Sequence, residues 1–318
     1  MKPSESEWPH ACARAGRTCT DMIVRSATPA DLERLIFLLD QAFIFDKKRT
    51  ISLQRRFPTV FCGGNLNNLI LCLDGDEIIS SLAMRRFDWL DDGKLYHGAM
   101  IGAVYTHPKQ RGKGLASRLL EAAAERLRIA GMDFGVLWTT QPAFYERLGW
   151  SMADCGVLGE MEIDVPKTQV PCDVVRSPAE NSAATIEAVR RRQMNATTLR
   201  QPGDYRQLPP PADTVDALLL NLGKENTGYA LAGRTGDTVI LYEMGGHPGC
   251  FPALWQAASF KCRHVLVNER ENSPSHRWLS ENTLLRWQPK ALAMWLPLSG
   301  KMETTPVAQW YIPYFDRI

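Results

Sequence analysis

The sequence lacks any apolar run of about 18 residues, the length that a membrane-spanning helix needs. It has little net charge, +2 over 318 residues, so no broad basic field predicts a nucleic-acid partner. Residues 1–21 show neither a periodic pattern nor the apolar stretch of a secretory signal. We therefore expect a cytoplasmic protein with a disordered segment over residues 1–21 and with no membrane or nucleic-acid partner. Its oligomeric state is not indicated.

The cysteines are few and scattered, and none of the eight belongs to a Cys-x-x-Cys pair. Without a secretory signal they are expected to be reduced thiols, so neither a disulfide framework nor a metal site is predicted. What the sequence does have is ordinary globular composition, with 45% hydrophobic and 23% charged residues. At about 150 residues per domain, the length suggests two domains.

A regular pattern of strands and helices begins near Met22. Thr28, Pro29 and Asp31 are typical of the first turn of a helix. Further strands are expected over residues 68–73, 77–87, 95–106 and 134–139, and helices over residues 115–130 and 142–148. The order β-α-β-β-β-α-β-α-β predicts an α/β (α+β) fold with a mixed sheet.

A second and weaker copy of this order follows. Val174-Val175-Arg176-Ser177-Pro178 echoes Ile23-Val24-Arg25-Ser26-Ala27. Strands are expected over residues 217–222, 228–234, 238–244 and 264–268, and a helix over residues 252–260. We therefore predict two domains, residues 22–165 and 166–318. The alternative is a chance echo between two ordinary α/β units.

The strongest chemical signal lies between a predicted strand and a predicted helix. Arg111-Gly112-Lys113-Gly114 there combines two glycines with basic side chains, and Lys109 adds a third positive charge. Glycines let backbone N–H groups converge on an anion, and a helix N-terminus adds unpaired donors. Neither Gly-x-x-x-x-Gly-Lys-(Ser/Thr) nor Gly-x-Gly-x-x-Gly after a first strand is present. The loop predicts phosphate binding; the alternative is a structural turn with solvated charges.

Two segments carry a family resemblance. Arg111-x-x-Gly114-x-Ala116 resembles the acyl-CoA signature of the GNAT superfamily, and the stretch from Phe144 to Trp150 resembles its FYxxxGF segment. The resemblance extends over about residues 22–155. It implies an N-acetyltransferase that moves the acetyl group of acetyl-CoA to a primary amine by direct attack in a ternary complex, without a metal. The acceptor would be a small molecule or a peptide.

The resemblance also implies roles for particular residues. The backbone of Val104, Tyr105 and Thr106 would pair with the pantetheine arm as an added strand would. The pyrophosphate would lie on the following loop and helix start, made up of Arg111, Gly112, Lys113, Gly114, Leu115, Ala116 and Ser117.

Tyr145 is the candidate general acid. An amine that attacks the thioester expels a thiolate, and a tyrosine with a pKa of about 10 can give it a proton. The alternative is a core aromatic with a solvated hydroxyl. The general base is not identified: a water chain, His97 or Glu77, or a carboxylate of the second half all remain open.

The second copy has Gly245-Gly246-His247-Pro248-Gly249 at the corresponding place, without the Arg-x-x-Gly-x-Ala pattern. We expect this half, a degenerate GNAT-like domain, to bind no CoA and to complete the acceptor pocket. The aromatic stretch Trp310–Ile318 is predicted to be a last strand of this domain, or else a pocket wall that includes Tyr311 and Tyr314.

The tandem arrangement resembles the front part of the Eis-like acetyltransferases, which carry a further C-terminal domain that this sequence is too short to include. Two other functions stay open. One is a Fem-like aminoacyl transferase, which the modest charge and the intact loop disfavour. The other is a non-catalytic acyl-CoA-binding sensor, which Tyr145 in its expected segment disfavours.

Overall fold

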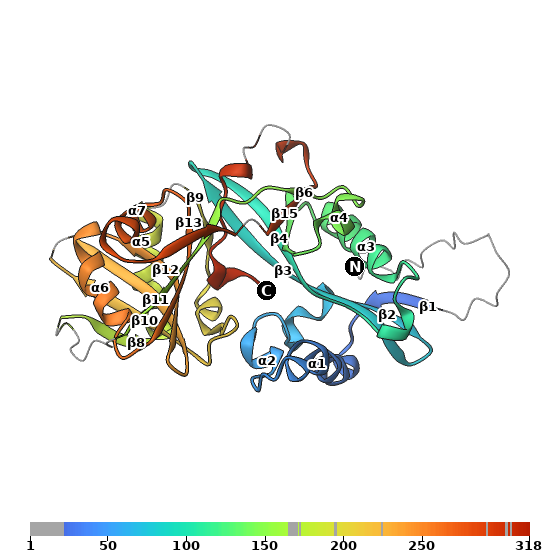
Figure 1. Ribbon diagram of the computed structural model, residues 1–318. Helices are drawn as coiled ribbons and strands as arrows, with labels where there is room; N and C mark the ends of the chain where they lie inside the picture. The colour runs from blue at the N-terminus through green and yellow to red at the C-terminus, as the bar shows by residue number, and fades with distance from the viewer. Residues whose placement is uncertain are drawn as a thin grey trace.

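A computed structural model describes residues 22–164, 171, 173–193, 196–223, 225–290, 292–302, 305 and 307–318. The chain forms two mixed sheets, each with helices packed against it (Figure 1). This confirms the predicted α/β class with mixed sheets. The expected disorder of residues 1–21 concerns a segment that lies outside the described residues.

The first sheet has the strand order β1-β2-β3-β4-β5, in which only β4 and β5 run parallel. The helices α1 and α2 cover one face, and α3 and α4 cover the other (Figure 1). The elements are β1 (Met22–Ser26), α1 (Pro29–Phe43), α2 (Leu53–Arg56), β2 (Leu69–Asp74), β3 (Glu77–Asp91), β4 (Lys94–Thr106), α3 (Leu115–Ile129), β5 (Phe134–Trp138), α4 (Pro142–Glu146) and β6 (Ser151–Met152).

The start of α1 follows from its first residues. Thr28 and Asp31 form a capping box, in which the backbone N–H of Thr28 donates to the carboxylate of Asp31. Pro29 occupies the first helical position, where its missing N–H costs no bond. Asp31 also pairs with Arg25 of β1 at 2.6 Å, so the cap joins the helix to the neighbouring strand.

The second sheet repeats the first one. Its order is β8-β10-β11-β12-β13, and again only the last pair, β12 with β13, is parallel among these strands. The elements are β8 (Val175–Pro178), α5 (Ala183–Gln193), β10 (Thr214–Asn221), β11 (Thr227–Thr235), β12 (Thr238–Gly246), α6 (Phe251–Ala258) and β13 (His264–Arg270). The two halves therefore share one frame, by which we mean the same strand order with the same single parallel pair, as the sequence echo predicts.

The halves exchange strands, which the sequence did not predict. The strand β7 (Gly156–Glu162) leaves the first half and lies between β13 and β14 (Arg286–Pro289) of the second sheet. In return, β15 (Ala293–Pro297) lies between β5 and β6 of the first sheet. The domain boundary at residue 165 stays a prediction, but the sheets themselves cross it in both directions.

A second link joins the halves beside this exchange. The strand β9 (Ala196–Leu199) follows α5 of the second half, yet it pairs with the end of β3 in the first sheet, over Asp88–Asp91. Because β7, β9 and β15 all cross, neither sheet is built from one continuous stretch of chain.

The prediction of a last strand over Trp310–Ile318 is wrong. This stretch contains a short 3-10 turn, Tyr314–Asp316, and pairs with no strand. Pro313 has no N–H to give to a ladder. The polar groups of Asp316 are instead bonded to buried side chains of other segments. The segment ends between the two halves, where Figure 1 marks the C-terminus.

Candidate active site

The loop between β4 and α3 depends on two glycines. Gly112 and Gly114 have φ angles of 78° and 74°, in the left-handed region that favours glycine. A Cβ at either position would meet no atom within 4 Å, so the backbone angle and not crowding calls for glycine here. Gly114 caps α3, and the helix then begins at the buried Leu115. The loop thereby leaves open space directly in front of a helix N-terminus.

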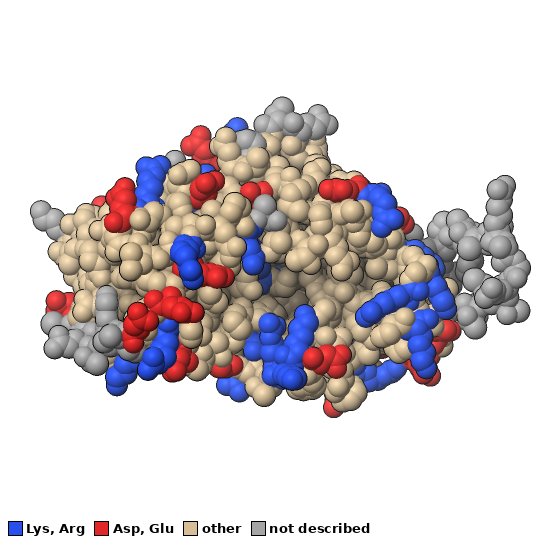
Figure 2. Space-filling view, in the orientation of Figure 1, with Lys and Arg blue, Asp and Glu red and all other residues tan. Residues whose placement is uncertain are grey.

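The same loop is basic and exposed. Lys113 donates from Nζ to the Oε1 of Gln110 at 2.6 Å, and the Nε of Arg111 lies 3.4 Å from the carbonyl oxygen of Thr106. The first backbone bond of α3 runs from the N–H of Arg118 to Gly114, so the earlier N–H groups have no carbonyl within the helix. Figure 2 shows Lys and Arg side chains gathered on this side of the first half. Positive charge and free donors together favour an anion such as a phosphate.

Behind the loop, β4 and β5 separate. The two strands pair from Gly98 with Phe134 to Met100 with Val136, while β4 continues along β3 to Thr106. The edge of β4 over 101–106 therefore faces no strand in the part of the chain that the structure describes. Val104, Tyr105 and Thr106 lie on this edge, as the resemblance requires of residues that would pair with an extended ligand.

A bulge interrupts β4 where this open edge begins. The register with β3 shifts between Ser81 and Ala83, and Ala103 has a φ of 48°. A Cβ on Gly102 would lie 2.6 Å from the backbone oxygen of Ile318, so a larger residue would displace the end of the C-terminal segment. Residues more than 200 positions apart thus meet at the bulge, which no sequence pattern indicated.

Tyr145 lies half-buried on α4. Tyr145 packs against the same apolar cluster as Val104, and Leu115 belongs to that cluster, so all three lie on the face of the sheet that α3 covers. Burial raises the pKa of the Tyr145 hydroxyl, which keeps it protonated at neutral pH. Within the described residues the hydroxyl makes no hydrogen bond, whereas the ring contacts Trp150 edge-on at 6.3 Å.

The two named candidates for the general base lie away from the bulge. His97 bonds to Asp88 at 2.8 Å and precedes Gly102 by five residues, roughly 17 Å along a strand. Glu77 precedes Ser80, which pairs with Thr106, so it lies beyond the other end of β4. Neither residue receives a catalytic role from this geometry.

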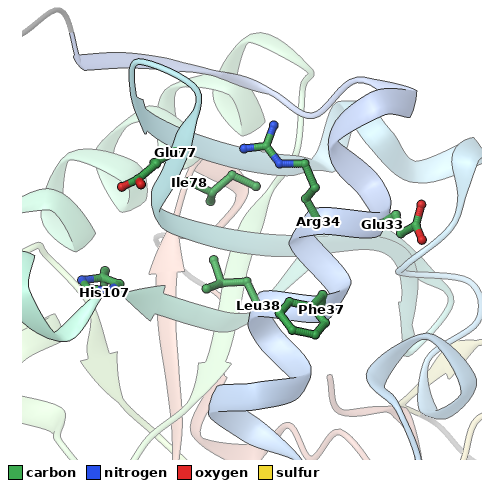
Figure 3. Close-up of a pocket in the computed structure, with 7 residues that line it drawn as sticks. All are labelled: Glu33, Arg34, Phe37, Leu38, Glu77, Ile78 and His107. Atoms are coloured by element: carbon green, nitrogen blue, oxygen red, sulfur yellow. The ribbon is translucent and has the colours of Figure 1, made fainter.

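A pocket of about 560 Å³ does adjoin Glu77. Figure 3 shows Leu38 of α1 and Ile78 of β3 in its middle, with Glu77 and His107 to one side. Arg34 at its edge bonds to the backbone oxygen of Asp76. The pocket is open to solvent and lies on the α1 face of the sheet, opposite the face that α3 covers.

A buried ion network holds the C-terminal segment. Arg200 bonds through Nε to Asp316 at 2.7 Å and through its terminal nitrogen to Glu243, and all three side chains are buried. Arg190 joins Glu243 at 2.9 Å. From β3 of the first sheet, Arg85 donates to the backbone oxygen of Asp316 at 2.9 Å. The network fixes Ile318, two residues later, between the halves.

In the second half, the corresponding loop begins in the same way and then differs. The ring of His247 accepts from the N–H of Gly249, as the ring of His107 accepts from Lys109. The helix α6 then begins at once with the buried Phe251, so four residues separate strand and helix instead of eight. The basic, glycine-spaced part of the loop is therefore missing.

The described residues include no group of three or more His, Cys, Asp or Glu side chains placed to hold a metal ion. None of their helices is both long and apolar enough to cross a membrane.

Comparisons with known proteins agree with this fold. Residues 23–153 match the family model of the GNAT acetyltransferase domain. The fold resembles a conserved protein of unknown function from Enterococcus faecalis described as a probable N-acyltransferase (TM-score 0.69, 16% identity, 88% of this chain and 73% of the other). It also resembles a GCN5-related N-acetyltransferase from Kribbella flavida, with a TM-score of 0.65 and 17% identity over 88% of this chain and 72% of the other. A third similar structure is Eis1 from Mycobacterium abscessus, with a TM-score of 0.58 and 12% identity over 87% of this chain and 73% of the other. No curated protein matches the chain.

Proposed function

We propose that the GNAT acetyltransferase domain formed by residues 23–153 transfers the acetyl group of acetyl-CoA to a primary amine, in a ternary complex of both substrates. One observation carries the proposal: a basic loop with two left-handed glycines opens onto a helix N-terminus, beside a strand edge that none of the described strands pairs with. Acetyl-CoA would supply an activated thioester. The residues of the chain would bind this donor, stabilise the developing charge and transfer the proton.

The loop and the strand edge would hold different parts of the donor. Backbone N–H groups from Gly112 to Ser117 would bind the pyrophosphate, with Arg111 and Lys113 adding charge. The backbone of Val104, Tyr105 and Thr106 would pair with the amides of the pantetheine arm. The acyl carbonyl would then lie at the bulge of β4, where backbone donors can stabilise the charge that develops on its oxygen.

Tyr145 would act when the carbon–sulfur bond breaks. The amine nitrogen forms the new bond to the acyl carbon, the thiolate leaves, and the Tyr145 hydroxyl gives it a proton. A thiol with a pKa of about 8.5 is more acidic than a buried tyrosine, so the tyrosinate left behind is the stronger base. It would take up, through water, the proton that the amine nitrogen releases on becoming an amide. The amine would approach from the side of the C-terminal segment, between the two halves.

A thiol-release assay with a panel of primary amines tests the proposal directly. We expect release that depends on the amine, and we expect Tyr145→Phe to lower turnover by ~10²-fold with little change in acetyl-CoA affinity. Tyr96→Phe is the matched control, because it removes a buried hydroxyl of the same half outside the open edge. Wild-type turnover in Tyr145→Phe would remove Tyr145 from the mechanism. Donor binding without release for any amine would favour the sensor alternative.

A further inference from the structure

A second pocket, of about 480 Å³, lies in the second half, at the ends of β12 and β13. These strands pair only from Thr238 with His264 to Leu241 with Val267, and both continue beyond that point. The pocket thus occupies the place where β4 and β5 separate in the first half. Its size suits a small molecule. Its walls include Thr197, Glu243, Gly245, Glu269, Ser273 and Tyr311.

One of the residues that line this pocket, Glu269, has a buried carboxylate with no positively charged partner among the described residues. Glu269 is only 7% exposed. Its oxygens accept from the hydroxyl of Ser275 at 2.5 Å and from the N–H of Arg270 at 3.0 Å, both neutral donors. Among the described residues, no Lys, Arg or His forms an ion pair with it. Burial raises the pKa of the Glu269 carboxyl to about 7, which expresses the cost of holding its charge there.

The other buried carboxylate of the pocket is neutralised. Glu243 pairs with Arg190 at 2.9 Å and also with Arg200, so these two guanidinium groups neutralise its negative charge. The remaining charges, Arg270, Glu271 and Arg277, are exposed at the rim, where solvent screens them. The interior of the pocket therefore carries one uncompensated acidic group, and a cation is the partner that a buried carboxylate lacks.

We propose that the pocket between β12, β13 and α7 (Pro274–Asn282) binds a small organic ammonium ion, whose N–H groups bond to Glu269 and whose carbon frame packs against the ring of Tyr311. An anion is disfavoured by the same carboxylate, and a metal ion lacks a cluster of ligands among the described side chains. The site is separate from the proposed acyl-CoA site and does not depend on the proposed function.

The test is calorimetry at pH 8 without acetyl-CoA, using three probes of one shape: benzylamine, benzyl alcohol and benzoate. The wild type should bind benzylamine at least ~10-fold more tightly than the alcohol and should not bind benzoate, because a charged hydrogen bond exceeds a neutral one by about that much. In Glu269→Gln, benzylamine should bind at least ~10-fold more weakly. Glu271→Gln, an exposed carboxylate two residues away, should leave binding unchanged.

Two further measurements locate the binding and guard against a misfolded variant. Ala196→Phe adds a bulky side chain to the pocket wall from β9, keeps the Glu269 carboxylate, and should also abolish benzylamine binding. Thiol release should persist in Glu269→Gln, since the residue lies outside the proposed acyl-CoA site. Equal affinity for all three probes, or benzylamine binding that survives both Glu269→Gln and Ala196→Phe, would overturn the proposal.

Discussion

The two halves of the molecule share a frame but differ at one place. In each half a strand runs parallel to its neighbour and then separates from it, and a His-Pro turn follows. Counting this turn, eight residues with two left-handed glycines separate strand and helix in the first half, whereas only four separate them in the second. The comparison teaches that the sheet does not need the loop. The longer basic loop is an addition to the shared strand order, which forms in the second half without it.

The difference extends to charge. The open strand end is accompanied by Lys109, Arg111 and Lys113 in the first half, and by the buried Glu269 in the second. A strand end without the basic loop could be filled by side chains, but here it holds a pocket with a buried acidic group. The two strand ends therefore differ in the sign of their charge, which favours ligands of opposite sign.

The largest effect is expected where the halves differ most. Gly114→Glu should reduce CoA binding by more than ~100-fold, because the side chain and its charge would occupy the space in front of α3. Calorimetry with CoA measures the loss. The added backbone strain at a φ of 74° should also lower thermal stability modestly.

Gly236→Glu separates these two effects. Gly236 lies in the turn between β11 and β12, has a φ of 53°, and likewise has no atom within 4 Å of an added Cβ. It should show the same strain with normal CoA affinity. A Gly114→Glu protein that binds CoA as the wild type does would disprove the loop assignment.

The next largest effect concerns the network that holds the halves together. Asp316→Asn should cost about 3 kcal/mol of unfolding free energy, since it leaves the fully buried Arg200 with one carboxylate partner fewer. The pKa of Asp316 is lowered to about 2, so its contribution is present above its ordinary pKa of 3.8 and is lost as the pH falls towards 2. Urea unfolding between pH 2 and pH 7 should show this acid-dependent part in the wild type and not in the variant.

The matched control is Asp216→Asn, which breaks the partly exposed pair with Arg176 in the same half. It should cost less than about 1 kcal/mol. Equal losses from the two variants would mean that burial of the network adds nothing.

Much of the fold could be predicted from the sequence because local signals agree with it. The capping residues before α1 and the glycines before α3 each act within a few residues. The exchange of β7 and β15 could not be predicted, because an apolar strand fits either sheet. The meeting of Ile318 with Gly102 and the pairing of Arg200 with Asp316 also join segments that no short-range pattern connects.

A smaller effect is expected in the second-half pocket. The carboxyl of Glu269 has a pKa of about 7 in the folded protein and an ordinary value of 4.5, so the folded state holds a proton that the unfolded state has lost. Stability should therefore fall between pH 4.5 and pH 7, by on the order of 3 kcal/mol at most. Glu243 across the pocket adds to this shift, and the bond from Ser275 opposes it.

Urea unfolding at several pH values checks this prediction. Glu269→Gln should flatten the profile between pH 4.5 and pH 7, while Glu271→Gln should reproduce the wild-type profile because its carboxylate is exposed. Parallel profiles for the wild type and Glu269→Gln would show that the carboxyl is ionised at ordinary cost and would weaken the case for a cation in the pocket.

The smallest effect concerns how the second half shapes the site of the first, and it depends on the proposed function. The guanidinium of Arg317 lies over the rings of Tyr311 and Tyr314, at 5.2 and 5.6 Å, and Tyr314 stacks on Tyr242. These contacts fix the residue that precedes Ile318 at the β4 bulge. We expect Tyr311→Ala and Tyr314→Ala to raise the KM of the amine roughly 3- to 10-fold, the scale of one cation–π contact, with the KM of acetyl-CoA nearly unchanged.

Packing is the competing explanation for the same aromatics, and stability alone does not distinguish the two. Trp278→Ala provides the comparison, because Trp278 packs on Phe251 within the second half and has no place in the C-terminal segment. It should lower thermal stability without changing the KM of either substrate. If Tyr311→Ala and Tyr314→Ala behave as Trp278→Ala does, with stability lost and amine kinetics unaltered in the folded fraction, then the C-terminal aromatics only seal the second half and the first half binds its acceptor without them.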